Sequence, residues 1–581
     1  MTRTDRFIVG TLVAMLVLIA TIIGLPAPLP AAGPSPSDGS APSIPGPIES
    51  RPYREGMVGH PISISPLTAR NQADRDLVAL IFSGLVRNGP DGSIVPDLAG
   101  SWTVDPTGAI WTFELRPEAR WQDGAPVTAE DVAFTIRTLQ DPSYTGPAAG
   151  SWQDVTVRTV GAQTVVFTLS TPLGGFLQAA TQRIAPAHIL AGVPVDQLAD
   201  DPFGRRPVGS GPFALVRLDG STAELRPASG VGTAETYPSD PSGLASDSLA
   251  TAAPTIRPSV PVPHLTGIEF RFFDDSDALL AAYRQGDLDG ASGLSPAVIG
   301  DLASATGSRI LRYPGSTLTA VLFNLRPDQH WFASARVRTA LLEAIDRPAL
   351  IESAFAMTAS AASGLIPPTS VLFDPAAAEA VAYDRTAAQK ALKGAGWSKV
   401  DNAWRRPTSK KPFTFDLLSP DAASNPAAFA AAEAVARDWK RIGLQVTHVA
   451  LPPGEFVTER LATGTFTVAV ADVTVGLDPD LYPLLASSQT RTGGSNVIGL
   501  QDPALDSLLV TARTPGTAAA RSAAYSALQV QLDKGRYLLP LAFADESIVV
   551  RDTLEGPVLR QVADPSDRFW DVLTWRLAAD R

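Results

Sequence analysis

An uncharged apolar run near the N-terminus of this chain is long enough to cross a membrane. The run, Phe7–Leu25, has nineteen residues and no charged side chain. A helix of this length would be about 28 Å long, close to the ~30 Å hydrocarbon core of a bilayer. Arg3 and Arg6 precede the run and no basic cluster follows it. The positive-inside rule therefore predicts a cytoplasmic tail at 1–6 and an extracytoplasmic body.

A cleaved signal peptide is the alternative interpretation of this run. Signal peptides have apolar regions of roughly 7–15 residues and a small-x-small cleavage site. Ala31–Gly33 offers such a site, although prolines surround it. Because the run is longer than a signal peptide needs, we expect an uncleaved transmembrane signal anchor at 7–25, and cleavage would instead give a secreted protein.

Proline-rich stretches mark segments that have little apolar surface to bury. Eleven prolines lie between Pro26 and Pro66, which predicts an extended linker over 26–55. Seven more lie in 227–263 among many serines and alanines. Such a composition cannot offset its ordering entropy, so we expect a surface insertion there.

The composition excludes several functional classes. There is no cysteine, which rules out disulfides, thiolate nucleophiles and cysteine-bound metals. The five histidines are scattered, so we expect no metal site and no cofactor. The net charge is −12 and no segment is a dense basic stripe. Nucleic-acid binding needs clustered cations, so we expect no nucleic-acid partner.

Hydrophobic periodicity predicts alternating helices and strands. Apolar residues recur at helical spacing in 71–86 and 431–441, whereas 101–115 alternates as in a β-hairpin. Gly443 ends the second helix and a strand follows at 444–450, an order that favours α/β layers.

Catalytic signatures are missing from the sequence, so we expect no enzyme. There is no nucleophile elbow, phosphate-binding loop, dinucleotide fingerprint or zinc-protease motif. Gly209–Gly211 encloses a serine, but we interpret it as a turn before a strand. Asp478 and Asp480 flank a proline as at a helix start, whereas Asp472 follows a predicted strand and is a candidate ligand contact.

Ordered sequence blocks resemble family 5 extracytoplasmic solute-binding proteins, the peptide-, nickel- and opine-binding receptors of ABC importers. Asp91–Trp102 (DGSIVPDLAGSW) and Trp121–Val132 (WQDGAPVTAEDV) are the longest blocks. Val208–Phe213 (VGSGPF), Val337–Arg347 (VRTALLEAIDR) and Lys390–Trp397 (KALKGAGW) follow in the family's order. The resemblance covers nearly everything from about residue 60 to the end.

This resemblance implies an α/β, bilobal periplasmic-binding-protein-like fold of type II, from the large cluster with an extra subdomain. Lobe I would comprise 56–268 and 512–581, with the subdomain at about 100–203, and lobe II would span 269–511. The protein would be a monomer that captures a peptide or another small solute and delivers it to ABC permease and ATPase subunits. A membrane-tethered binding or sensor protein for a non-peptide solute, without a dedicated importer, is the alternative.

The resemblance also indicates where a ligand would bind. Peptide-binding relatives often place an aspartate three residues before an Asp-Pro or Glu-Pro pair, to hold the peptide ammonium. Here that position is Val475, which leaves the ligand's identity open. Arg326 would bind a ligand carboxylate, unless it forms a surface ion pair, and Asp472 a ligand ammonium. The expected ligand-binding residues are Asn324, Arg326, Asp472, Thr474 and Asn496.

Overall fold

The computed structural model describes the folded part of the chain. The described residues are 51–89, 93–147, 152, 154–228, 263–303, 306–378, 380–407, 409–490 and 494–578. The predicted anchor, nearly all of the linker and nearly all of the insertion lie outside them. Among the described residues, no helix combines the length and apolarity that crossing a membrane requires. Contacts group Pro47–Arg581 into one compact unit.

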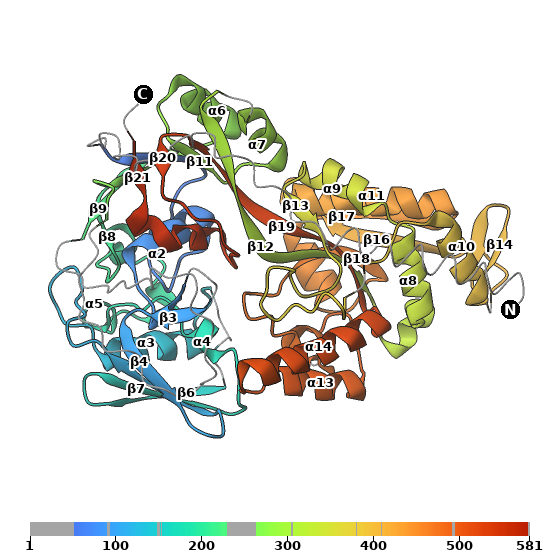
Figure 1. Cartoon of the computed structure of the whole chain (residues 1–581), viewed down its shortest axis with the longest axis horizontal. Helices are drawn as coiled ribbons and strands as arrows, with labels where there is room; N and C mark the ends of the chain where they lie inside the picture. The colour runs from blue at the N-terminus through green and yellow to red at the C-terminus, as the bar shows by residue number, and fades with distance from the viewer. Residues whose placement is uncertain are drawn as a thin grey trace, which may run out of the picture. The chain divides into compact units, whose positions relative to one another are not determined.

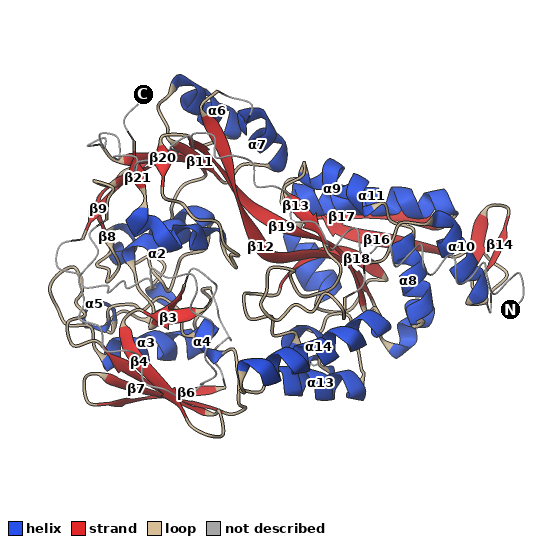
Figure 2. Cartoon of the chain, viewed as in Figure 1, coloured by secondary structure: helices blue, strands red, loops and turns tan. Residues whose placement is uncertain are grey.

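A mixed sheet of eleven strands is the main element of this unit (Figures 1 and 2). Strands β16, β17 and β18 are parallel, β12 and β19 form an antiparallel pair, and β1 is parallel to β10 and β11. In spatial order the strands are β17 (Gln445–Leu451), β16 (Thr414–Pro420), β18 (Val468–Thr474), β12 (Ser308–Phe323), β19 (Leu538–Arg551), β11 (Gly290–Ser292), β1 (Tyr53–Val58), β10 (Ile268–Phe273), β9 (Thr222–Pro227) and β8 (Phe213–Leu218), with β13 (Ala359–Ala361) also pairing with β19.

A separate antiparallel sheet of four strands lies within the expected subdomain. Its order is β4 (Ala99–Val104), β5 (Ile110–Leu115), β7 (Thr164–Leu169) and β6 (Val155–Val160). The hairpin predicted over 101–115 is its β4–β5 pair. Two-stranded pairs complete the described strands: β2 (Val86–Asn88) with β3 (Ile94–Pro96), β14 (Ser398–Val400) with β15 (Ala403–Arg405), and β20 (Leu554–Glu555) with β21 (Arg576–Leu577).

Along the sequence, the helices lie mainly between strands. The α-helices are α2 (Gln72–Ile81), α3 (Ala129–Gln140), α4 (Phe176–Ala179), α5 (Ala187–Leu190), α6 (Ser276–Gln285), α7 (Pro296–Ala303), α8 (Ala335–Glu343), α9 (Arg347–Phe355), α10 (Arg385–Gly394), α11 (Pro426–Ile442), α12 (Tyr482–Leu485), α13 (Pro503–Arg513) and α14 (Ala518–Gly535). The 3₁₀ helices are η1 (Val195–Gln197), η2 (Pro202–Arg205), η3 (Pro327–Phe332), η5 (Ser487–Thr490) and η6 (Pro565–Thr574), and η4 (Glu455–Leu461) is a π-helix.

Alternating side chains place a layer of helices on each face of the central strands. On β18, Val468 and Val470 pack into the hydrophobic cluster that includes α11, whereas Ala469 and Ala471 pack into the cluster that includes α13 and α14. This is the period of two expected for a strand buried on both faces. Gly443 ends α11 at φ +100°, as the sequence predicts, and the strand β17 follows.

The packing of α14 bears on the expected division into lobes. Its residues Tyr525, Leu528 and Leu532 share a core with β12 and β18, which belong to the expected lobe II. The other large cluster combines residues 53–272 with residues 548–577, and it also includes Leu311 and Tyr313 of β12. The lobe boundaries themselves stay a prediction, because the contacts join all of Pro47–Arg581.

A buried ionic cluster ties the two ends of the described chain together. The Arg568 guanidinium on η6 donates to Glu55 at 2.6 Å and to Asp76 at 2.5 Å. All three side chains are almost fully buried. Ser566 and Gln72 also donate to Asp76, so its carboxylate is well satisfied. The two carboxylates raise the pKa of Arg568 although burial acts in the opposite direction.

Glu546 on β19 lies beside this cluster, and we predict that it makes stability fall as pH rises. Burial, followed by the charges of Asp564 and Asp76, raises the pKa of Glu546 to about 7, although Arg568 and Arg75 oppose the shift. The folded state thus favours the protonated form. Its contribution is complete below the unfolded pKa of ~4.5 and is lost as pH rises through ~7.

The expected result is measured by urea unfolding between pH 4.5 and 7.5. The wild-type chain should lose about 2–3 kcal/mol relative to Glu546→Gln across this window. Glu555→Gln is the control, because Glu555 forms only a half-exposed ion pair with Arg576. Parallel pH profiles for the wild type and Glu546→Gln would contradict the prediction.

Candidate functional site

Two of the five predicted ligand residues, Asp472 and Thr474, lie exposed on β18. Opposite them on β12 are Thr319 and Thr317, in antiparallel register. Asp472 Oδ1 accepts a 2.6 Å hydrogen bond from the Thr319 hydroxyl, and its Oδ2 accepts a 2.7 Å bond from the Asn425 amide. These bonds fix the carboxylate while leaving it open to solvent.

The topology explains why polar groups gather at this place. Strands β16 and β18 are parallel, so their carboxyl ends lie at the same edge of the sheet. Asn425 follows β16 and caps α11 by accepting from the Ala428 N–H. Ligands of α/β proteins bind outside the carboxyl ends of such strands. Asp472, Thr474 and Asn425 therefore form a polar edge suited to contacting a solute.

Asn324 and Arg326, two further predicted ligand residues, are bonded to neighbouring loops. The Asn324 side chain is 1% exposed, and its amide donates to the Gly464 and Phe466 carbonyls, each at 2.8 Å. Arg326 donates to Asn324 Oδ1 at 3.2 Å and to the Val497 carbonyl at 2.8 Å. Among the described residues Arg326 has no acidic partner, so the surface ion pair considered from the sequence does not form with any of them. Both side chains hold loops together.

Asn496 is likewise committed to the backbone. It is 1% exposed, and its amide nitrogen lies 3.0–3.2 Å from the carbonyls of Leu485, Ala486 and Leu500. Its Oδ1 accepts from the Leu500 N–H at 3.1 Å. With every polar atom bonded internally, Asn496 has no group left for a ligand in this structure.

The aspartates near Val475 also have internal partners. Asp478 accepts two bonds from Arg521, at 2.8 and 2.9 Å, and Asp480 accepts from Arg513 at 3.0 Å. Burial raises the pKa of Asp480, and the Arg513 charge opposes this shift. Val475 is 6% exposed and packs into the hydrophobic core. No carboxylate thus occupies the position that peptide-binding relatives often use.

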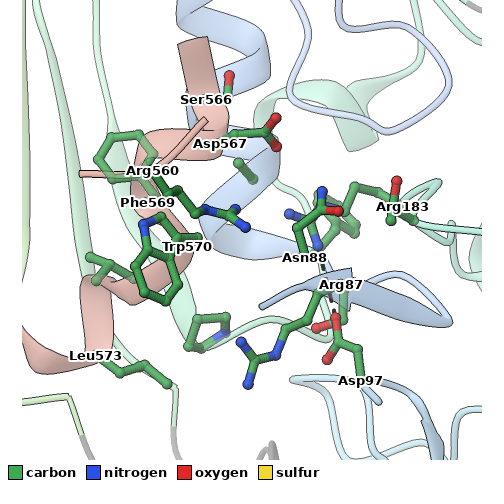
Figure 3. Close-up of a pocket in the computed structure, with 16 residues that line it drawn as sticks. Arg87, Asn88, Asp97, Arg183, Arg560, Ser566, Asp567, Phe569, Trp570 and Leu573 are labelled. Carbon is green, nitrogen blue, oxygen red and sulfur yellow. Dashed lines mark ion pairs between the residues drawn. The ribbon is translucent and has the colours of Figure 1, made fainter. Parts of the chain in front are cut away.

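A cavity that the sequence did not reveal lies between α2, β2 and η6 (Figure 3). Its volume is about 150 Å³. Three arginines line it with Asp97 and Asp567, and Asn88 contributes a buried Oδ1 that has no hydrogen-bond partner among the described residues. Pockets for whole small ligands measure ~300–1,000 Å³, so this cavity fits only part of a solute. The lining arginines are Arg87, Arg183 and Arg560.

No sequence signal pointed to this cavity because its walls come from distant parts of the chain. The Arg183 guanidinium and the Asp97 carboxylate lie 3.8 Å apart there. Asp97 belongs to the block at 91–102, but nothing in that block indicates Arg183 as its partner. Arg560 reaches across to donate to the Gly89 carbonyl at 2.7 Å. Only the folded topology brings these groups together.

The described residues group no set of metal ligands, and the serine enclosed by two glycines is not exposed. Ser210, the serine enclosed by two glycines, is fully buried, and its hydroxyl accepts from the Ser83 N–H at 3.2 Å. The chain bends at residues 210–212 just before strand β8, where the sequence predicts a turn. Within the described ranges, no three histidine or acidic side chains are grouped as metal ligands.

Comparison with known proteins agrees with this picture of a binding protein. A putative ABC transporter peptide-binding protein of Brucella ovis is 27% identical over 444 residues, which cover 74% of this chain and 76% of the relative. The Bacillus subtilis oligopeptide-binding protein AppA, solved with a nonapeptide, has a TM-score of 0.68 at 20% identity and covers 91% of this chain and 100% of its own. NikZ of Campylobacter jejuni, solved with Ni(L-His), has a TM-score of 0.68 at 21% identity with the same coverage.

The structural neighbours thus share the bilobal α/β fold of periplasmic binding proteins. The model of the bacterial extracellular solute-binding proteins, family 5, matches residues 93–496, well over half of the chain. This match confirms the resemblance found in the sequence blocks. The chain is therefore a member of family 5 of the bacterial extracellular solute-binding proteins.

Proposed function

We propose that this protein captures a peptide or a similar small solute between two lobes and delivers it to the permease and ATPase subunits of an ABC importer. Family membership supports the general role, and the polar edge formed by Asp472, Thr474 and Asn425 is the observation that supports a ligand site. A receptor of this type works by closure, because a ligand that contacts both lobes favours the closed state.

Asp472 is the proposed partner of a ligand cation. Its carboxylate is exposed but already oriented by Thr319 and Asn425, so little ordering entropy is lost when a ligand ammonium binds. Thr474 adds a hydroxyl two residues along the same strand face. The cavity beside η6 would receive one group of the solute rather than the whole molecule.

A non-peptide solute is the second candidate ligand class. The buried Val475 and the Asp478–Arg521 pair favour it, because they leave the family's usual ammonium position without a carboxylate. Asp472 would then bind a cationic group other than a peptide α-ammonium. A tethered receptor or sensor without its own importer remains the corresponding alternative for the cellular role.

Mass spectrometry of the solute released from purified, denatured protein tests this proposal. Recovery of a peptide supports the first candidate, and recovery of a non-peptide cation supports the second. A protein that repeatedly releases no solute, and that binds none from peptide and amine libraries, would contradict the receptor role. The same purified material shows by its N-terminal residue whether the proposed membrane anchor at 7–25 is retained.

Asp472→Asn should weaken binding of the identified solute by about 1.5–3 kcal/mol, the usual contribution of a charged hydrogen bond. Calorimetry measures the affinity. Asp416→Asn is the matched control, because Asp416 is an exposed carboxylate on the neighbouring strand β16. Equal affinities for all three proteins would remove Asp472 from the site without affecting family membership.

A further inference from the structure

Positive charge is concentrated in one short part of this acidic chain. Residues 385–411 contain eight lysines or arginines and one acidic residue, a net charge of +7. The rest of the chain carries −19, since the total is −12. Six of the seven lysines lie between Lys390 and Lys440. The cations are spaced along the sequence, so they do not form a continuous basic run.

The fold gathers these cations with others from separate helices. Lys399 on β14 donates to the Ile442 carbonyl at 2.8 Å, which places the β14–β15 hairpin at the end of α11. Arg336 on α8 donates to the Gly394 carbonyl at the end of α10, at 3.5 Å. Figure 1 shows α10 and β14 together at the right of the view. The exposed cations of this basic surface are Arg336, Arg385, Lys390, Lys393, Lys410, Lys411, Lys440 and Arg441.

Few acidic groups neutralise the basic surface. Among the described residues, Arg441 is its one member with an ion pair, at 2.8 Å from Asp438. Asp384 is engaged in capping α10, and Asp401 lies at the turn between β14 and β15. Burial, and then the nearby charge of Lys393, lower the pKa of Lys399. Repulsion between neighbouring cations is relieved when an anionic partner binds.

We propose that the basic surface docks on a membrane that exposes anionic lipid headgroups. Cations on the ends of helices and on a hairpin suit an extended anionic plane better than a small anion, which needs a converging pocket. The negative surface potential of an anionic bilayer attracts each lysine or arginine close to it. Val400 at the hairpin turn is 39% exposed among these cations and adds an apolar contact. If the anchor predicted at 7–25 is retained, a membrane is also the surface nearest to this chain.

Acetylation of lysines in the full-length protein tests this docking. The protein is mixed with vesicles of phosphatidylcholine alone or with phosphatidylglycerol, then treated with an amine-reactive ester. Phosphatidylglycerol should slow acetylation of Lys390, Lys393, Lys410 and Lys411 at least about threefold. High salt should abolish this protection. Lys534 is the internal reference, because it is exposed on α14, outside the basic surface.

A pair of variants separates docking from general adsorption. Lys410→Gln with Lys411→Gln should reduce the protection of Lys390 and Lys393, whereas Lys534→Gln should not. Equal acetylation rates on both vesicle types would overturn the proposal, as would equal slowing of Lys534. Protection by soluble polyphosphate but not by phosphatidylglycerol vesicles would also overturn it, and would assign the surface to a soluble polyanion.

Discussion

Arg568→Met is expected to destabilise the folded chain by about 3–5 kcal/mol, because it leaves buried carboxylates without their cation. Glu55 and Asp76 are both fully buried and both bond to the Arg568 guanidinium. Methionine fills much of the same volume, so the loss reports charge rather than a cavity. Urea unfolding followed by circular dichroism measures the change.

Two further variants separate the charge effect from packing. Arg576→Met removes a half-exposed ion pair with Glu555 and should cost less than about 1 kcal/mol. Combining Arg568→Met with Glu55→Gln and Asp76→Asn should recover part of the lost stability, since no buried charge is then unpaired. An Arg568→Met protein as stable as Arg576→Met would show that the cluster is hydrated rather than buried.

Asn496→Ala should lower the free energy of unfolding by about 3 kcal/mol, since several buried backbone groups lose their partner. The Asn496 amide links the Leu485, Ala486 and Leu500 backbones within a single loop cluster. Gln501→Ala, at an exposed position in the same segment, should change stability by less than about 0.5 kcal/mol.

The Asn496→Ala variant also distinguishes a structural role for Asn496 from a role in binding the ligand. A structural role predicts a loss of stability, with the affinity of the remaining folded protein for its solute unchanged. A ligand contact predicts the reverse. Thermal unfolding and calorimetry on the same Asn496→Ala sample distinguish them, and weakened binding at wild-type stability would contradict the structural role.

Local elements of this fold could be predicted from the sequence because local chemistry specifies them. The β4–β5 hairpin has alternating aromatic residues around a turn, and α11 has an apolar stripe that ends at Gly443. The sequence at 318–324 is typical of a strand, and 318–323 form the second half of β12, which begins at Ser308. The first half is not predicted from the sequence because Pro314 and Gly315 are typical of a strand end. In the structure they lie beside an irregularity in the pairing of β12 with β19, and the strand continues through them.

Site residues were less predictable because burial depends on distant segments. Asp472 could be placed at a strand end from its own neighbours, and the structure leaves it exposed there. Asn324 and Arg326 have the same residue types as ligand contacts, but the loops near Gly464 and Val497 engage them. The cavity beside η6 and the basic surface each combine elements that no sequence spacing relates.

The contact between Arg568 and Glu55 has a consequence for how the chain acquires its structure. These residues are 513 positions apart, and β19, which pairs with both β12 and β11, begins only at Leu538. A growing polypeptide that stops before Leu538 lacks the strand on which both cores depend. Native contacts at such separations form slowly, because distant segments must meet first. The sheet and the buried ionic cluster therefore cannot be completed before the segment from Leu538 to Arg568 has been synthesised.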